Sequence, residues 1–207
     1  MQGSVTTSPH RPLNLLHDVE LAALAAAGDR KAFGELVRRH NAAVRTFVRR
    51  LGAAPDVADD IAQDAFLAAF EAIADYRGEG AFVGWVRRIA ARLYVKRWRK
   101  IGGEAALAEE TPAEEVDAHA DQHSAANRLD LDEALRGLSE PERLCVSLCY
   151  GAGLSHAEAA EIAQAPIGTV KSHVKRGLDK LRRRLDPQGE RPLGSDEAGR
   201  NGTRSHG

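Results

Sequence analysis

The sequence has few of the residues from which chemical sites are built. Only two of its 207 residues are cysteine, Cys145 and Cys149, and they lie four apart in an apolar helical pattern. That spacing suits buried thiols better than a disulfide, metal or redox site. The sequence has no Cys/His set with the close spacing of a zinc site, no phosphate-binding loop and no nucleophile beside a base. We therefore expect no metal, no cofactor and no catalytic activity.

Long apolar runs are lacking as well. Near the N-terminus the one apolar run is LNLL at residues 13–16, which is too short for a signal-peptide core or a membrane span. The sequence therefore predicts a cytoplasmic protein. The alternation of apolar and polar residues that marks strands does not rise above noise, so we expect an all-α fold.

The formal net charge of −1 does not indicate a partner, but the charges are unevenly distributed along the chain. Residues 87–100 contain no acid, residues 171–184 contain only Asp179, and residues 104–132 between them are rich in acids. Two basic blocks separated in this way suggest nucleic-acid contact at two places.

Apolar residues recur at helical spacing in two long stretches, which predicts two helical domains. Asp29 follows a break at Gly28 and is a plausible N-cap for the second helix. The expected organisation is a disordered leader, a first domain, a flexible acidic linker, a second domain and a disordered tail. The boundaries are residues 1–17, 18–100, 101–127, 128–185 and 186–207.

Residues 154–185 carry the clearest local pattern. Ser155 is placed to cap a short helix, Pro166 ends the following turn, and a second helix begins near Ile167 or Gly168. Val170, Val174, Leu178 and Leu181 would face the core, and the residues expected to point outward are Lys171, Ser172, His173, Lys175 and Arg176. Two helices joined by a tight turn, with a basic outer face on the second, indicate a DNA-binding helix-turn-helix. An ordinary helical hairpin with a solvated charged face is the alternative.

Three segments in this order resemble a known family: DDIAQDAF (59–66), YRGEGAFVGW (76–85) and GTVKSHVKR (168–176). Together they are similar to the two conserved domains of extracytoplasmic-function sigma factors of bacterial RNA polymerase, and the resemblance extends from Asp18 to Leu185. It implies a subunit that binds core RNA polymerase, recognises the minus-ten and minus-thirty-five promoter elements and helps to melt DNA. An anti-sigma factor is implied as a further partner.

The resemblance also assigns roles to residues. The positions that match polymerase-docking residues are Asp60, Gln63 and Asp64. The loop and helix expected at the minus-ten element contribute Tyr76, Arg77, Gly78, Glu79, Phe82, Arg88, Arg92, Lys96 and Arg99. The second helix of the helix-turn-helix would meet the minus-thirty-five element with Thr169, Lys171, Ser172, His173, Lys175 and Arg176. Trp85 and Trp98 are expected in the core, and Tyr94 could stack on a base.

The chain departs from the family pattern at three places. Arg92 and Lys96 stand where Asn and Asp are common, and Pro166 replaces a frequent Ser. Gly177 replaces a usual Ala inside a helix, which would cost about 1 kcal/mol. The resemblance also implies that the acid-rich residues 109–121 thread through the polymerase active-site cleft.

Two other classes of function fit less well. A helix-turn-helix regulator acting without polymerase would have a ligand-sensing or dimer-forming N-terminal half, which has no need of a basic helix beside a glycine loop. A nucleic-acid-processing enzyme would need clustered carboxylates, and the candidates Asp59, Asp60 and Asp64 fit a docking face better.

Overall fold

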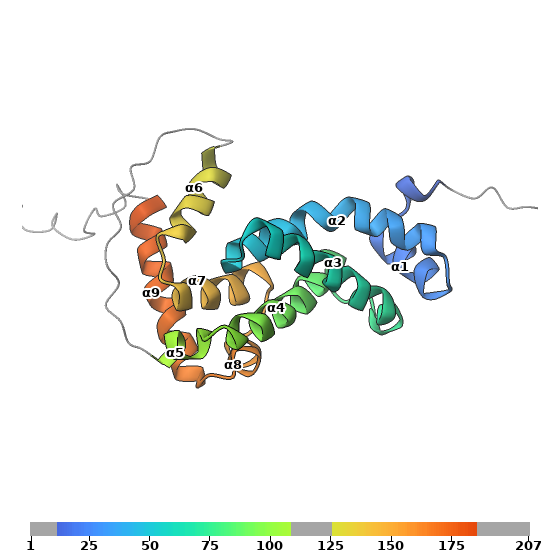
Figure 1. Ribbon diagram of the computed structural model, residues 1–207. Coiled ribbons are helices and arrows are strands. Elements are labelled where there is room, and N and C mark those ends of the chain that lie inside the picture. The colour runs from blue at the N-terminus through green and yellow to red at the C-terminus, as the bar shows by residue number, and fades with distance from the viewer. Residues whose placement is uncertain (1–11, 109–125, 186–207) are drawn as a thin grey trace, which may run out of the picture.

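The computed structural model describes residues 12–108 and 126–185, and within these ranges every regular element is helical. The N-terminal half contains η1 (Leu13–Leu15), α1 (Asp18–Ala26), α2 (Arg30–Leu51), α3 (Pro55–Glu71), η2 (Ile73–Asp75), α4 (Phe82–Lys100) and α5 (Gly103–Ala108). The C-terminal half contains α6 (Ala126–Arg136), α7 (Glu140–Val146), the π-helical turn η3 (Ser147–Gly151), α8 (His156–Ala163) and α9 (Ile167–Leu185) (Figure 1). The predicted all-α class is confirmed. None of the described helices is long and apolar enough to cross a membrane.

Local capping explains where several helices begin and end. The side chain of Asp29 accepts hydrogen bonds from the backbone N–H groups of Lys31 and Ala32, which confirms the predicted N-cap of α2. Gly52 ends that helix with a φ of +118°, a left-handed conformation that favours glycine. Ser155 caps α8 as predicted and forms a capping box with Glu158.

Helices α2, α3 and α4 pack together and form the core of the N-terminal half. Each places an apolar stripe inward, and aromatic rings join the stripes, with Phe33 in edge-to-face contact with Phe70 at 4.9 Å between centroids. The buried members from α4 are Phe82, Val86, Ala90, Ala91, Tyr94, Val95 and Trp98. The polar residues of α3 and the basic residues of α4 are therefore left on the outside.

The expected disordered leader differs from the structure at residues 12–17. Here the guanidinium of Arg39 donates hydrogen bonds to the carbonyls of Leu13, Asn14 and Leu16 at 2.8 to 3.1 Å. It also pairs with Asp18 at 3.1 Å. One cation thus satisfies several backbone acceptors, which holds η1 against α2.

Helices α8 and α9 form the predicted helix-turn-helix. Val170, Val174 and Leu181 are buried and Leu178 is half-buried, as the helical spacing predicted. Gln164 makes the turn in a left-handed conformation with a φ of +51°. The neighbouring α7 packs along α9 and orients the motif.

The two halves share one continuous core. Leu144, Cys145 and Leu148 from the C-terminal half belong to the same buried cluster as α2 and α4. Part of the predicted linker is helical, because α5 begins at Gly103 directly against the indole ring of Trp98. The acid-rich residues 109–121 and the tail 186–207 lie outside the described residues.

Gly177 is accounted for by the packing of α7 on α9. A Cβ atom at this buried position would lie 2.7 Å from Cγ2 of Val146, closer than side chains can approach. The missing side chain therefore permits close contact between the two helices, and the cost in helix propensity expected from the sequence is offset by this contact.

We expect Gly177→Ala to lower the free energy of unfolding by about 1 kcal/mol. Overpacking of a tight contact costs about 1–3 kcal/mol, which exceeds the gain of about 1 kcal/mol in helix propensity. Urea titration monitored by circular dichroism measures the difference. Gly34→Ala is the matched control, because a Cβ there meets no atom within 4 Å and should stabilise the chain. A stabilised Gly177→Ala variant would contradict the packing explanation.

Candidate polymerase and promoter interface

The outer face of α3 carries the three residues expected to dock on polymerase. Asp60, Gln63 and Asp64 are all exposed, and neither carboxylate has an ion-pair partner among the described residues. The neighbouring Asp59 differs, since it is held by Arg45 of α2 at 2.5 Å. Of the three carboxylates that the sequence places together, Asp59 is therefore held in an ion pair, whereas Asp60 and Asp64 are available to a partner.

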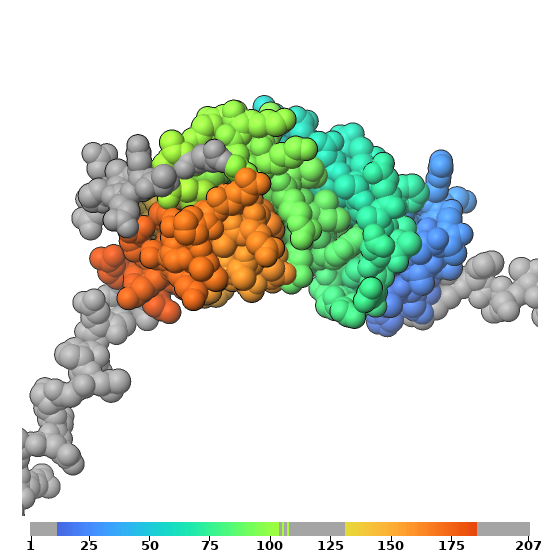
Figure 2. Space-filling view, turned by 90° about the horizontal axis from the view of Figure 1, so that it is seen from below, coloured from blue at the N-terminus to red at the C-terminus, as the bar shows by residue number. Residues whose placement is uncertain are grey.

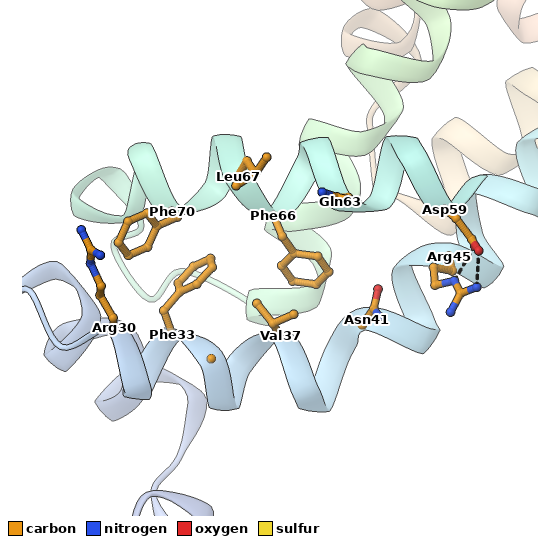
Figure 3. A pocket seen from close by; sticks show the side chains of 11 residues that line it. Arg30, Phe33, Val37, Asn41, Arg45, Asp59, Gln63, Phe66, Leu67 and Phe70 are labelled. Carbon is orange, nitrogen blue, oxygen red and sulfur yellow. Dashed lines mark hydrogen bonds and ion pairs between the residues drawn. The ribbon is translucent and has the colours of Figure 1, made fainter. Parts of the chain in front are cut away.

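An apolar groove of about 740 Å³ runs beside this acidic face, between α2 and α3 (Figure 3). Phe33, Phe66 and Phe70 line it, and Leu67 stands at its edge with 56% of its surface exposed. The sequence analysis did not single out Leu67 as an exposed apolar residue. Its position off the apolar stripe of α3, one helical turn from Gln63 and Asp64, is the signal that could have identified it.

The glycine loop before α4 is shaped by its own aromatic residues. The Tyr76 hydroxyl donates a hydrogen bond to the carbonyl of Gly80 at 2.9 Å, and the ring packs edge-to-face on Phe82 at 5.4 Å between centroids. Gly78 and Gly80 both have positive φ, +74° and +83°. Phe82 is buried beneath the loop, so it supports the loop, while Arg77 and Glu79 are exposed.

The basic residues of α4 lie on two sides of the helix. Arg92 and Lys96 are exposed and line a cleft of about 680 Å³ with Arg99, Lys100 and residues of α8. Arg88 is half-buried against the C-terminal half, where it donates a hydrogen bond to the carbonyl of Gly153 at 2.9 Å.

The aromatic residues of α4 serve the core. Trp98 is buried as expected, and its Nε1 donates a hydrogen bond to Glu140 at 2.6 Å. Trp85 is half-buried and packs against the core. The suggestion that Tyr94 stacks on a base is wrong for this conformation, because the ring is buried. Burial and the nearby Glu140 raise the pKa of Tyr94 to about 12.

Helix α9 presents Lys171, Ser172, Lys175 and Arg176 outward, as predicted, and Thr169 is half-buried. His173 is a correction: it was expected to point outward, but only 4% of its surface is exposed. It falls within the helical stripe next to Val174, and its Nδ1 lies 3.1 Å from Nη2 of Arg176. A histidine can pack in a core once its ring nitrogens have partners.

A buried glutamate holds the basic side chains of α9. Glu142 of α7 is 3% exposed and accepts a hydrogen bond from Lys180 at 2.9 Å, and it lies 3.9 Å from Arg176. The same carboxylate accepts from the backbone N–H of Ser139 in a capping box. The sequence gives no sign of this cluster, because Arg176 and Lys180 are more than thirty positions away from Glu142.

Cys145 and Cys149 are free thiols; Cys145 lies in the core and Cys149 is half-buried against it, in agreement with the predicted core packing. Burial and the neighbouring Cys149 raise the pKa of Cys145 to about 12. Among the described residues no group of His, Cys, Asp and Glu could hold a metal ion.

Comparison with known protein families identifies both halves. The family description Sigma-70 region 2 matches residues 36–103, which span most of α2 to the start of α5. The description Sigma-70, region 4 matches residues 134–183, which contain the helix-turn-helix.

Individual relatives match over most of the chain. The ECF RNA polymerase sigma-E factor of Haemophilus influenzae is 30% identical over 184 residues, covering 83% of this chain and 97% of that protein. The factor of the same name from Escherichia coli K12 is 33% identical over 184 residues, covering 83% of this chain and 96% of that protein. Among solved structures, the sigma factor RpoE of Bartonella quintana, bound to the anti-sigma factor NepR, is 27% identical with a TM-score of 0.49. It covers 76% of this chain and 99% of that one. The chain therefore belongs to the extracytoplasmic-function sigma factors, with which RNA polymerase recognises promoters.

Proposed function

We propose that the three surfaces described above divide the work of promoter recognition. The α3 face with Asp60, Gln63 and Asp64 docks on core polymerase, and the loop before α4 together with the basic residues of α4 holds the minus-ten element. Helix α9 reads the minus-thirty-five element. One observation supports the proposal above all. The apolar stripes of α3, α4 and α9 are buried in the core, so α3 exposes an acidic face and α4 and α9 each expose a basic face.

At the minus-ten element, some residues would contact DNA and others would hold the loop in place. Arg77 and Glu79 are the exposed side chains of the loop, with Gly78 allowing the backbone to approach an extruded base. Tyr76 and Phe82 hold the loop in shape. Arg92, Lys96 and Arg99 would bind phosphates of the melted strand.

At the minus-thirty-five element, the first half of α9 would enter the major groove. Lys171 and Lys175 are four apart and exposed, so they can reach base edges or phosphates from one face. Arg176, held between His173 and Glu142, has less freedom and is suited to a fixed contact. His173 is buried, so it would position Arg176 and not contact DNA itself.

The proposal carries four further statements. The protein works in the cytoplasm and has no catalytic activity of its own, since polymerase performs the chemistry. It requires no cofactor. An anti-sigma factor controls it, as NepR binds the relative from Bartonella quintana.

The docking assignment predicts that Asp60→Lys with Asp64→Lys weakens binding to core polymerase at least about tenfold. Both side chains are exposed, so the free energy of unfolding should change by no more than about 0.5 kcal/mol. A titration of labelled protein with core polymerase measures the affinity. The matched control is Asp56→Lys with Glu71→Lys, two exposed acids near the ends of the same helix. Equal affinities for both double variants would contradict the docking face.

The minus-thirty-five assignment predicts that Lys171→Ala, Lys175→Ala and Arg176→Ala together abolish the holoenzyme footprint over the upstream element. Loss of a base-reading side chain should cost about 1–3 kcal/mol of binding free energy and relax specificity at one position, whereas loss of a phosphate contact should weaken binding to all sequences equally. Arg182→Ala with Arg183→Ala, exposed cations in the last turn of α9, is the control. An upstream footprint that survives the triple change would show that another element reads this DNA.

The minus-ten assignment predicts a change in salt dependence. Arg92→Asn with Lys96→Asp removes two cations from α4, so the salt slope of open-complex formation should flatten by about one to two units, at roughly 0.7–0.9 per phosphate contact. Abortive transcription at several salt concentrations gives the slope. Arg49→Asn with Lys31→Asp makes the same charge change on exposed positions of α2 and should leave the slope unchanged. Coinciding slopes for wild type and the α4 variant would mean that these side chains touch no phosphate.

A further inference from the structure

A buried carboxylate lies beneath the basic face of α9. Glu142 of α7 is 3% exposed, and it accepts hydrogen bonds from the backbone N–H of Ser139 at 3.1 Å and from Nζ of Lys180 at 2.9 Å. Nε of Arg176 lies 3.9 Å from the same carboxylate. A buried charge is costly unless partners of opposite charge compensate it. Glu142 therefore holds two cations, which lie one helical turn apart on α9.

Gly177 allows α7 to bring this carboxylate close to α9. A Cβ at Gly177 would lie 2.7 Å from Cγ2 of Val146 and 3.5 Å from Cβ of Glu142. Because glycine has no side chain, α7 packs directly on α9 between the positions of Arg176 and Lys180. In the space-filling view of Figure 2, the orange and red helices of the C-terminal half form one closely packed surface. The glycine that departs from the family pattern thus belongs to the same arrangement as the buried carboxylate.

The guanidinium of Arg176 is held from a second direction by His173. Nη2 of Arg176 lies 3.1 Å from Nδ1 of His173, whose residue surface is 4% exposed. Arginine has no acceptor atom, so the guanidinium donates this bond and Nδ1 accepts it. The contacts with His173 and Glu142 involve Nη2 and Nε. Since a guanidinium has five N–H donors, both N–H groups of Nη1 and one of Nη2 are left for an outside partner, and the side chain is 42% exposed.

The exposed lysines of α9 differ from Arg176 in chemistry. Lys171 and Lys175 carry a point charge on a flexible stem, which suits a contact with a phosphate. A planar guanidinium in a fixed orientation suits a base edge, because two parallel N–H donors match two acceptors only in one geometry. Holding the side chain before DNA binds also reduces the entropy lost on binding. The contacts that fix Arg176 therefore bear on specificity.

We infer that Glu142 is a positioning residue for promoter recognition: it orients Arg176 so that the outer edge of the guanidinium reads one base pair of the minus-thirty-five element. This role rests on the proposed function of α9, and it assigns the base contact to Arg176 and phosphate contacts to Lys171 and Lys175. Glu142 itself does not touch DNA. Guanine is the expected base, because it presents two acceptors to the major groove.

The first test measures base preference with the complete holoenzyme. Transcription is compared between a preferred upstream element and elements changed at one base pair at a time, so that each position gives a ratio of rates. Arg176→Ala should lower this ratio at least about tenfold at the position that Arg176 reads. Glu142→Gln should lower it about three- to tenfold at the same position and leave the ratios at the other positions unchanged.

The choice of Gln and a matched control separate positioning from folding. Glu142→Gln removes the charge but keeps an oxygen that accepts from the Ser139 N–H, so the capping box is retained. In the control Glu133→Gln the same charge is lost from a residue that also lies 3.9 Å from a cation of α9, Arg184. A purely structural role would reduce the amount of active holoenzyme and lower all rates alike, which leaves every ratio unchanged.

The second test asks whether Glu142 acts through Arg176. In the Arg176→Ala background, adding Glu142→Gln should leave every ratio unchanged, because the side chain that Glu142 orients is already absent. His173→Leu replaces the other contact of the guanidinium with an apolar side chain at a buried position. It should lower the ratio at the same position, and it tests the positioning of Arg176 independently of how well Glu142→Gln folds.

Three outcomes would overturn the role of Glu142. These are ratios of Glu142→Gln and His173→Leu equal to those of wild type, a loss spread evenly over all upstream positions, and a further loss when Glu142→Gln is added to Arg176→Ala. An effect of Glu133→Gln as large as that of Glu142→Gln would count against it equally. Failure of the proposed function has a different signature, because wild-type holoenzyme would then show no preference at any upstream position.

Discussion

The burial of one face of α4 is the constraint on which the rest of the structure depends. Val86, Ala90, Val95 and Trp98 are each at most 3% exposed. Burying a large apolar side chain contributes about 1.5–3 kcal/mol, whereas an exposed ion pair contributes about 0–1 kcal/mol. The apolar stripe therefore decides how the helix is rotated, and the cations follow. Arg92 and Lys96 face outward because their neighbours face inward, and the buried Trp98 donates a hydrogen bond to Glu140 in the second half.

The features that the sequence predicted correctly depend on interactions between near neighbours in the chain. Asp29 and Ser155 cap helices through N–H groups two or three residues away, so the sequence contains both partners in one short segment. The buried positions Val170 and Val174 follow from helical periodicity in the same way. The exposure of Asp60 and Asp64 was predictable because the opposite stripe of α3 is strongly apolar.

The features that the sequence did not predict depend on partners far away in the chain. Arg39 orders residues 13–16 from over twenty positions away, and Trp98 gives the start of α5 a surface to pack on. His173 shows a different limit: a polar residue beside an apolar stripe can lie on either side, and the contact with Arg176 and the packing of α7 settle the choice. The pairing of Arg88 with Glu158 has no local signal at all, since seventy residues separate them.

The central claim is that this chain gives core polymerase its choice of promoter through two separate DNA elements. Reconstitution of the full chain with core polymerase on a library of randomised promoters, followed by sequencing of the transcripts, tests that claim most directly. We expect transcripts whose templates share two blocks of preferred sequence, at the minus-ten and minus-thirty-five positions, with the upstream block lost when Lys171, Lys175 and Arg176 are replaced by Ala. Transcripts no more sequence-selective than those of core polymerase alone, or selection of a single site that the chain binds equally well without polymerase, would contradict it.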